Sequence, residues 1–386
     1  MNKTSRIEYS GGGSSLALLL FCTVTVFGGT SAQAAVLDGM LTGVEESIAE
    51  HVAKKGEKLK TGNFYTAEKP NAHGPIGMMG DHTHDKGEVM FTYRYMQMFM
   101  EGNRNGTDDL SDAAVRGQGY AVVPTKMTMQ MHMFGAMHGL TDTVTVTVMV
   151  PYILNSMDHI AGMPLGAVNF TTRSEGVGDI RFGSLWRLWA VEAPSIGAHR
   201  FHFNFTLSVP TGDIEPTDST PAGGPNTRLP YPMHLGSGTV DVYPGLTYGG
   251  EMGKASWLVQ AIGTIRTGRN YNGFNKGNAY EVNVAGGYEF TRWLSGSTRL
   301  SWNDWANYNG LDSTISSPPI IVPTADPNRR GGQRLDILGG INILFPEFMG
   351  FENRLAVEGG APIYQWLRGP QLETDWIITV GWQSIY

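Results

Sequence analysis

Cysteine is almost absent from this chain, and its scarcity excludes two kinds of stabilisation. The 386 residues include a single cysteine, Cys22, which lies in an apolar segment near the N-terminus. One thiol cannot build a disulfide framework or a thiolate zinc site. Phe21 before Cys22 is a poor residue for lipoprotein cleavage, so we do not expect a lipid anchor at this position.

Charged residues and long apolar runs are also scarce. Charged side chains make up 16% of the sequence, whereas about 25% is usual in soluble domains. No apolar run of about 18 residues follows the first 34 residues, so membrane-spanning helices are not expected. The formal net charge of -7 offers no basic surface for nucleic acid. With 51 glycines and 10% aromatics, this composition favours strands with one face in lipid and one in a polar interior.

The first residues have the pattern of a secretory signal peptide. Lys3 and Arg6 precede an apolar run from Leu16 to Phe27. Ala32 and Ala34 then form the small-residue motif of a cleavage site, which predicts a signal peptide over residues 1–34. The apolar run is shorter than the roughly 20 residues that a spanning helix needs.

The last residues, 374–386, alternate between apolar and polar side chains. Trp376, Ile378, Val380, Trp382 and Tyr386 fall on one face, and Asp375, Thr379, Gly381 and Gln383 on the other. This alternation is typical of a strand in an outer-membrane barrel, with its apolar face toward lipid. We therefore expect a location in the outer membrane of a Gram-negative bacterium, and recognition of the strand ending at Tyr386 by the barrel-assembly machinery.

The remaining sequence predicts an all-β fold, a transmembrane antiparallel β-barrel of about 12 strands; 10 or 14 strands stay open, and a soluble β-sandwich is a distant alternative. The candidate strands are residues 87–101, 119–135, 142–152, 176–190, 199–211, 236–249, 254–268, 278–290, 293–307, 332–345, 352–364 and 374–386. The connections between them alternate between long and short, as extracellular loops and periplasmic turns do in such barrels. We expect residues 35–86 to form a periplasmic N-terminal extension of helix plus loop, and residues 87–386 to form the barrel; whether the N-terminal segment plugs the lumen stays open.

Charged residues with the parity of the polar face are candidates for the wall of the lumen. They are Arg94, Arg181, Arg187, Arg200 and Glu358. In a water-filled pore, such side chains solvate the lumen and set its selectivity. Each one taken alone is more simply a wall residue than a binding site.

Methionine and histidine are concentrated in the first third. Fourteen of the 19 methionines and six of the ten histidines lie between His73 and Met163. Strand parity predicts an interior cluster of Met90, Met96, Met98, Met100, His132 and Met149, with His82 and His84 at the periplasmic mouth. Thioether and imidazole ligands suit Cu(I). The same parity predicts that Met127, Met129, Met131 and Met133 face lipid. The alternative is that the methionines only pack the wall.

Sequence signals for catalysis are weak. The chain has no G-x-S-x-G elbow, no H-E-x-x-H motif and no phosphate-binding loop. A barrel-embedded hydrolase stays an alternative because catalytic triads are spatial rather than sequential. We expect no enzyme activity and no cofactor apart from the candidate Cu(I).

Three segments resemble a known family. They are Val177-Gly-Asp-Ile-Arg-Phe-Gly183, the turn and strand from Gly139-Leu-Thr-Asp142 to Val150-Pro-Tyr152, and Ser208-Val-Pro-Thr-Gly-Asp213. Residues 87–386 resemble the family of outer-membrane transporters named for the meta-pathway of phenol degradation. The resemblance implies a barrel that transports small solutes, aromatic compounds among them. The methionine- and histidine-rich first third departs from the family pattern and suggests a metal-associated branch.

Overall fold

The computed structural model describes residues 31–61, 69–162, 168–221, 223–315, 319, 321–348 and 350–386. The chain divides into two units, Met1–Gly56 and Glu57–Tyr386. In the first unit, helix α2 (Ser31–Lys54) is the described element. The predicted signal peptide lies outside the described residues up to residue 30. Among the described helices, none has both the length and the hydropathy to cross a membrane.

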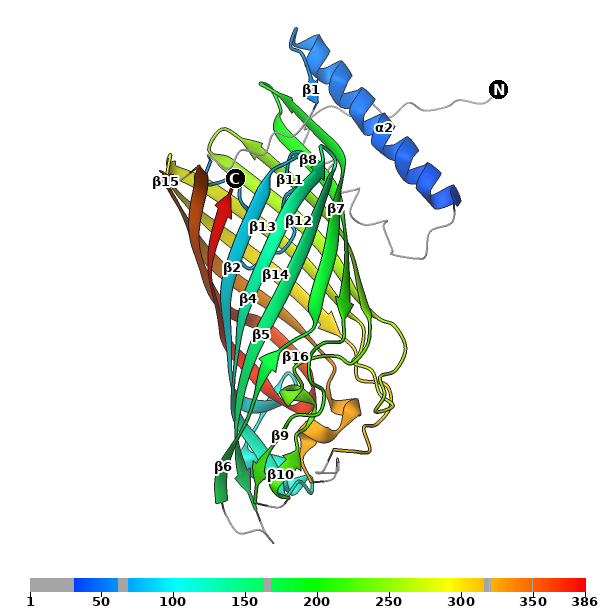
Figure 1. Ribbon diagram of the computed structural model, residues 1–386, viewed down its shortest axis with the longest axis vertical. Helices are drawn as coiled ribbons and strands as arrows, with labels where there is room; N and C mark the ends of the chain where they lie inside the picture. The colour runs from blue at the N-terminus through cyan, green and yellow to red at the C-terminus, as the bar shows by residue number, and fades with distance from the viewer. Residues whose placement is uncertain are drawn as a thin grey trace, which may run out of the picture. The chain divides into compact units, whose positions relative to one another are not determined.

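The second unit is a closed antiparallel barrel (Figure 1). Its wall contains β2 (Val89–Gly106), β4 (Val122–Thr141), β5 (Val144–Ala161), β6 (Val168–Val177), β7 (Ile180–Ala193), β8 (Gly197–Val209), β11 (Asp241–Met252), β12 (Ala255–Arg266), β13 (Ala279–Thr291), β14 (Leu294–Trp305), β15 (Gly332–Phe348) and β16 (Phe351–Ile385). The smaller elements are β1 (Lys60–Thr61), β3 (Asp108–Leu110), β9 (Thr217–Thr220), β10 (Gly224–Arg228), helix α3 (Asp112–Gly117) and the 3-10 turns η1 (Tyr231–Met233), η2 (Pro323–Ala325) and η3 (Pro327–Arg329).

The wall is crossed twelve times, as predicted. Strands β6 and β7 both pair with β5 and together make one crossing. Strand β16 makes two, because residues 351–367 pair with β15 and residues 367–385 pair with β2, which closes the ring. The predicted loop 153–175 is wrong, because much of it belongs to β5 and β6 in the extracellular half of the wall. The predicted connection 365–373 lies where β16 passes from its first crossing to its second.

The connections are sorted by length between the two ends of the barrel. Two-residue turns join β4 to β5, β11 to β12 and β13 to β14. At the other end, residues 210–240 and 306–331 form long connections that contain β9, β10 and the 3-10 turns. This sorting confirms the predicted short periplasmic turns and long extracellular loops.

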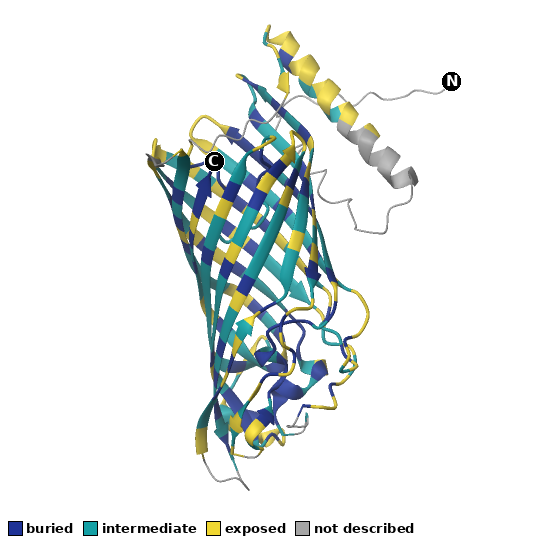
Figure 2. Cartoon of the chain, viewed as in Figure 1, coloured by how far each residue is buried: buried dark blue, intermediate teal, exposed yellow. Residues whose placement is uncertain are grey.

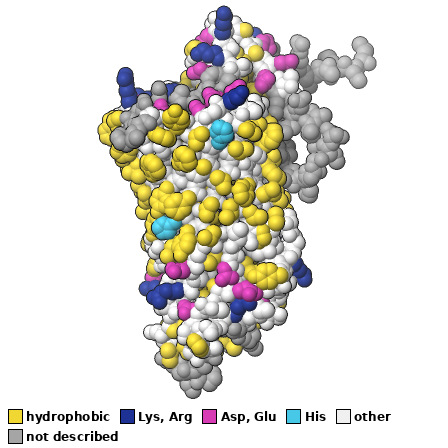
Figure 3. Space-filling model, in the orientation of Figure 1, with side chains coloured by type: hydrophobic (Ala, Val, Ile, Leu, Met, Phe, Trp, Pro, Cys, Tyr) yellow, Lys and Arg dark blue, Asp and Glu magenta, His cyan; other side chains and the backbone are white. Residues whose placement is uncertain are grey.

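The side chains alternate between a polar interior and an apolar exterior. Asn283, Arg299 and Ser301 are buried inside the barrel, whereas Val284 and Leu300 are exposed on its outer surface. Figure 2 shows this alternation along the strands, and Figure 3 shows a belt of hydrophobic side chains around the visible face, with charged groups beyond it. The apolar belt and the barrel place the protein in the outer membrane, with its exterior in lipid.

The two faces of β14 allow a direct test of this placement. Leu300→Lys puts a charge into the lipid belt and should cost about 2–4 kcal/mol of unfolding free energy. Ser301→Lys is the matched control, because Ser301 is the next residue, faces the interior and pairs with Asp336. Urea unfolding of both variants in lipid vesicles should show a large loss only for the first. Equal losses would contradict the orientation of β14.

Candidate functional site

Residues 69–86, here called the inner segment, run through the interior of the barrel. They contact inward-facing side chains of β2, β8, β12, β14 and β16, strands that lie all around the ring. This position differs from the predicted periplasmic extension, of which these residues are the last part. The sequence pattern could not show it, because the segment has no strand or helix of its own and is held by the wall.

Side chains of the barrel wall form hydrogen bonds with the backbone N–H and C=O groups of the inner segment. Arg94 donates from Nη1 to the carbonyl oxygen of Met78 at 2.9 Å, and Arg200 donates from Nη2 to that of Ala72 at 2.9 Å. The backbone N–H of Gly77 donates to Glu358 Oε2 at 3.0 Å. Buried backbone groups need such partners.

Further bonds fix the middle of the inner segment. Arg354 Nη2 donates to the carbonyl oxygen of Gly74 at 2.6 Å, and His202 Nε2 donates to that of Gly80 at 2.9 Å. Gly77 lies so close to the wall that a Cβ atom there would collide with Glu358 and Arg299. The segment is therefore seated tightly against the polar side of the barrel.

The histidines of the inner segment are buried, and His84 lies at the predicted periplasmic end of the barrel, beside the turn that joins β4 to β5. His82 Nδ1 lies 3.0 Å from Asp81 Oδ1, and the ring centroids of His82 and His84 are 4.8 Å apart. The backbone N–H of His84 donates to Thr145 Oγ1 at 2.8 Å, and its Nδ1 lies 3.3 Å from Glu88 Oε2. These contacts fold the segment onto itself and anchor it to β5.

The five residues predicted to line the lumen all have inward positions. Arg94, Arg200 and Glu358 contact the inner segment as described above. Arg187 Nη1 lies 3.5 Å from Asp85 Oδ1, at the end of the same segment. Arg181 instead faces open space, with Cζ 4.8 Å from the ring centroid of Tyr243. Their effect on selectivity stays a prediction.

A cavity of about 440 Å³ lies beside the inner segment. One side is lined by thioethers, those of Met79, Met96, Met98, Met131, Met133, Met137 and Met149. The facing side is polar and includes Arg299, Arg334, Asp336, Gln260 and Asn303. Arg299 forms two bonds of 2.8 Å to the carboxylate of Glu358. The cavity is therefore amphipathic across its width.

The prediction that Met127, Met129, Met131 and Met133 face lipid is wrong. In the register of β2 and β4, Met96 lies opposite Met131 and Met98 opposite Met129. Residues directly opposite in an antiparallel pair share a face, so both rows point inward. The outer face of this hairpin carries polar side chains such as Gln97 and Gln130. On β4 they made the outer face look like the inner one.

The candidate metal ligands do not form one cluster. Met96, Met98 and Met149 line the cavity, whereas Met90 packs near Met137, Leu185 and Ile385. Met100 belongs to an extracellular cluster around Met127 and Met233. His132 is not inward as predicted, because its Nδ1 bonds the hydroxyl of Tyr93 at 2.8 Å on the outer face. In the described part of the chain, no three His, Cys, Asp or Glu residues have metal-binding positions.

Three residues of the site were missed by sequence reasoning. Arg299, Arg334 and Arg354 are inward arginines on β14, β15 and β16, and Arg354 contacts the inner segment. The available signal was their parity with neighbouring polar residues, such as Ser301 beside Arg299 and Glu358 beside Arg354.

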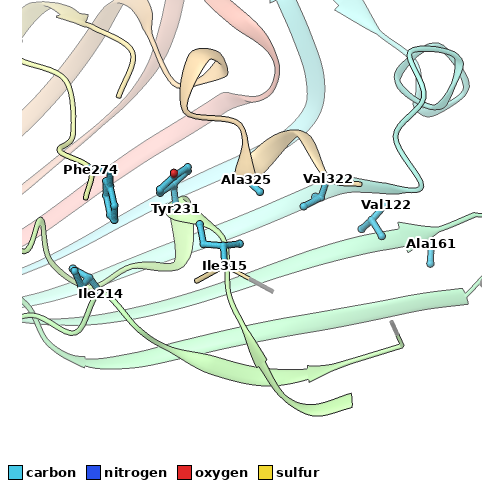
Figure 4. Close-up of a cluster of buried hydrophobic side chains, with 8 residues drawn as sticks. All are labelled: Val122, Ala161, Ile214, Tyr231, Phe274, Ile315, Val322 and Ala325. Carbon is cyan, nitrogen blue, oxygen red and sulfur yellow. The ribbon is translucent and has the colours of Figure 1, made fainter. Parts of the chain in front are cut away.

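The extracellular end of the barrel is filled by its own loops. Figure 4 shows the buried cluster, which consists of Val122, Ala161, Ile214, Tyr231, Phe274, Ile315, Val322 and Ala325. The N–H of Asp312 donates to the hydroxyl of Tyr231 at 3.0 Å. Burial lowers the pKa of His234 in the same region to about 3, so its ring is neutral there. The extracellular loops thus pack against one another around a hydrophobic core.

Comparisons with known proteins support the fold. No family model matches the chain, and no curated protein matches it in sequence. An outer membrane channel from Pseudomonas putida F1 superposes with a TM-score of 0.54 at 13% identity, covering 80% of this chain and 99% of the channel. A FadL homologue from Pseudomonas aeruginosa has a TM-score of 0.36 at 10% identity, with 85% and 98% covered. The first similarity shows the outer-membrane barrel fold, and the second is too low to carry an argument.

The orientation of β4 can be checked with single cysteines, since a chain expressed from Ala35 contains none. His132→Cys labelled with bimane should be quenched by brominated lipids, because His132 is on the outer face. Met131→Cys is the matched neighbour and should escape quenching inside the barrel. Quenching at position 131 and not at 132 would show that Met131 faces lipid and His132 faces the interior, as the sequence predicted.

Proposed function

We propose that this protein is an outer-membrane channel for small solutes that is closed at rest by the inner segment. The observation that carries the proposal is the amphipathic cavity of about 440 Å³ enclosed by a twelve-crossing wall. Twelve strands leave room inside a barrel beyond what side chains fill. Passage requires the inner segment to move, because its bonds reach strands on several sides, and it also requires the packed extracellular loops to part. We propose no enzyme activity.

We propose aromatic compounds among the solutes. The thioether side of the cavity supports this proposal, because sulfur makes favourable contacts with aromatic rings. Tyr243 and Trp305 add aromatic surface to the same cavity. The sequence resemblance to the phenol-pathway transporters points to the same class of solute.

Weakening the hold on the inner segment should open the channel. Arg354→Gln removes the guanidinium that bonds the carbonyl oxygen of Gly74 and the side chains of Asn342 and Gln383. Since a hydrogen bond to a charged group contributes about 1.5–3 kcal/mol, the ratio of open to closed channels should rise by about tenfold or more. Single-channel recording in planar bilayers measures it.

Arg368→Gln is the matched control for the same recordings. Arg368 is also on β16 and carries the same charge, but it is exposed and its guanidinium lies over Trp366. The open probability of the Arg368→Gln protein should equal that of the wild type. A correctly folded Arg354→Gln protein that conducts no better than the wild type would count against closure by the inner segment.

We propose Cu(I) binding as a second function, on the strength of one observation. The register of β2 and β4 places Met96 opposite Met131, and both thioethers line the cavity together with that of Met98. Soft sulfur ligands select Cu(I). Two features oppose the proposal, because Arg334 and Thr374 both contact Met98 Sδ at 3.7 Å and the facing wall carries arginines.

Copper retention tests this second function. The variant Met96→Leu/Met131→Leu should lose Cu(I) in competition with bathocuproine and still fold, because these swaps conserve side-chain volume. Met252→Leu is the control, since Met252 lies in an exposed turn. Equal retention by all three proteins would leave the methionines as wall packing.

A further inference from the structure

We propose that the cavity binds small apolar carboxylates, with the apolar body against the methionines and the carboxylate on Arg181. The inference deepens the proposed channel function and rests on it for its biological meaning. The binding itself follows from three features of the cavity: the position of Arg181, its missing counter-charge and the chemistry of its neighbours.

Arg181 borders the thioether side directly. It lies opposite Met149 in the pairing of β5 with β7. Met149 in turn lies opposite Gly135 on β4, two residues from Met133 and near Met137. Because paired residues in an antiparallel sheet are about 4.5–5.5 Å apart at Cα, the guanidinium stands at the edge of the methionine surface. A molecule lying on the thioethers can therefore reach it.

Three of the other four arginines that line the cavity already have carboxylate partners, and the fourth, Arg94, donates to the carbonyl oxygen of Met78 in the inner segment. Arg299 is paired with Glu358 at 2.8 Å, Arg334 with Asp336 at 2.8 Å, and Arg266 with Asp241. No ion pair involves Arg181 within the described residues, where its guanidinium stacks over Tyr243. Arg181 can thus accept an anion without breaking an ion pair or a hydrogen bond to the inner segment.

The carboxylates near Arg181 are engaged by other groups. Lys276 and Arg266 are electrostatic neighbours of this region, together with the carboxylates of Asp179 and Asp241. Asp179 is occupied by the backbone N–H groups of Gly212 and Ser237, at 3.0 and 2.7 Å. Glu281 also faces the cavity, but it accepts a bond from Asn283 and interacts with Asp336 on the opposite side.

The chemistry of the site fits a carboxylate with an apolar body. A guanidinium matches the geometry of a carboxylate through two parallel hydrogen bonds. Polarizable thioethers accept flat or flexible apolar groups. The volume of about 440 Å³ lies in the range of small-molecule sites. Benzoate is a suitable probe, and benzamide is its neutral counterpart with nearly the same shape.

The test is calorimetric titration of the full protein in detergent with benzoate and with benzamide. The wild type should bind benzoate more tightly than benzamide. Arg181→Gln should weaken benzoate binding about tenfold, as expected for the loss of a charge-assisted bond, and Arg181→Lys should restore part of it. Benzamide binding should change little. The control is Arg292→Gln, which removes a charge in an exposed periplasmic turn.

Heat-dependent gel migration verifies that each variant is folded. Equal affinity for the two probes, or unchanged benzoate binding by folded Arg181→Gln, would overturn the inference. Swelling in arabinose of proteoliposomes that contain the Arg354→Gln protein, in which the channel should be open, tests the channel separately. Arabinose uptake without selective benzoate binding would refute the inference and keep the channel, whereas benzoate binding that depends on Arg181 without arabinose uptake would support the inference and refute the channel.

Discussion

The structure depends on the hydrogen bonds between the inner segment and the polar face of the wall. A segment rich in glycine and proline has no ladder of its own, so inside a barrel its N–H and C=O groups must find side-chain partners. The wall has the opposite need, because buried guanidinium and carboxylate groups are costly without partners. Arg94, Arg200, Arg354 and Glu358 meet both needs at once. Neither part would be stable in this form without the other.

The side chains that line the interior differ from one side of the barrel to the other, rather than from one end to the other. Strands β2, β4 and β5 present thioethers, and β12 to β16 present amides and paired charges. A uniform polar lumen would favour hydrated solutes, and a uniform apolar one would exclude water. The observed division instead suits molecules that are themselves two-sided, and it places polar groups where they can also hold the inner segment.

Much of the barrel could be predicted from sequence, because lipid outside and polar groups inside impose a period of two on every crossing. The terminal strand shows this clearly: Thr379 and Gln383 are buried, and Trp376 and Trp382 are exposed, as predicted. The same reasoning assigned the two faces of β4 the wrong way round, because the polar side chains of His132 and Gln130 face outward there. It also failed for residues 69–86, whose position is set by partners up to 281 residues away. Local patterns contain no information about such partners.

The contacts of the inner segment have a consequence for the order of assembly. Gly74 and Arg354, which share a hydrogen bond, are 280 residues apart, and Arg354 lies on the strand whose second crossing pairs with β2 to seal the ring. Residues near the start of the unit therefore cannot complete their bonds until the last strand is in place. During biogenesis, the full set of bonds around the inner segment can therefore form only after the strand that carries Arg354 has joined the sheet.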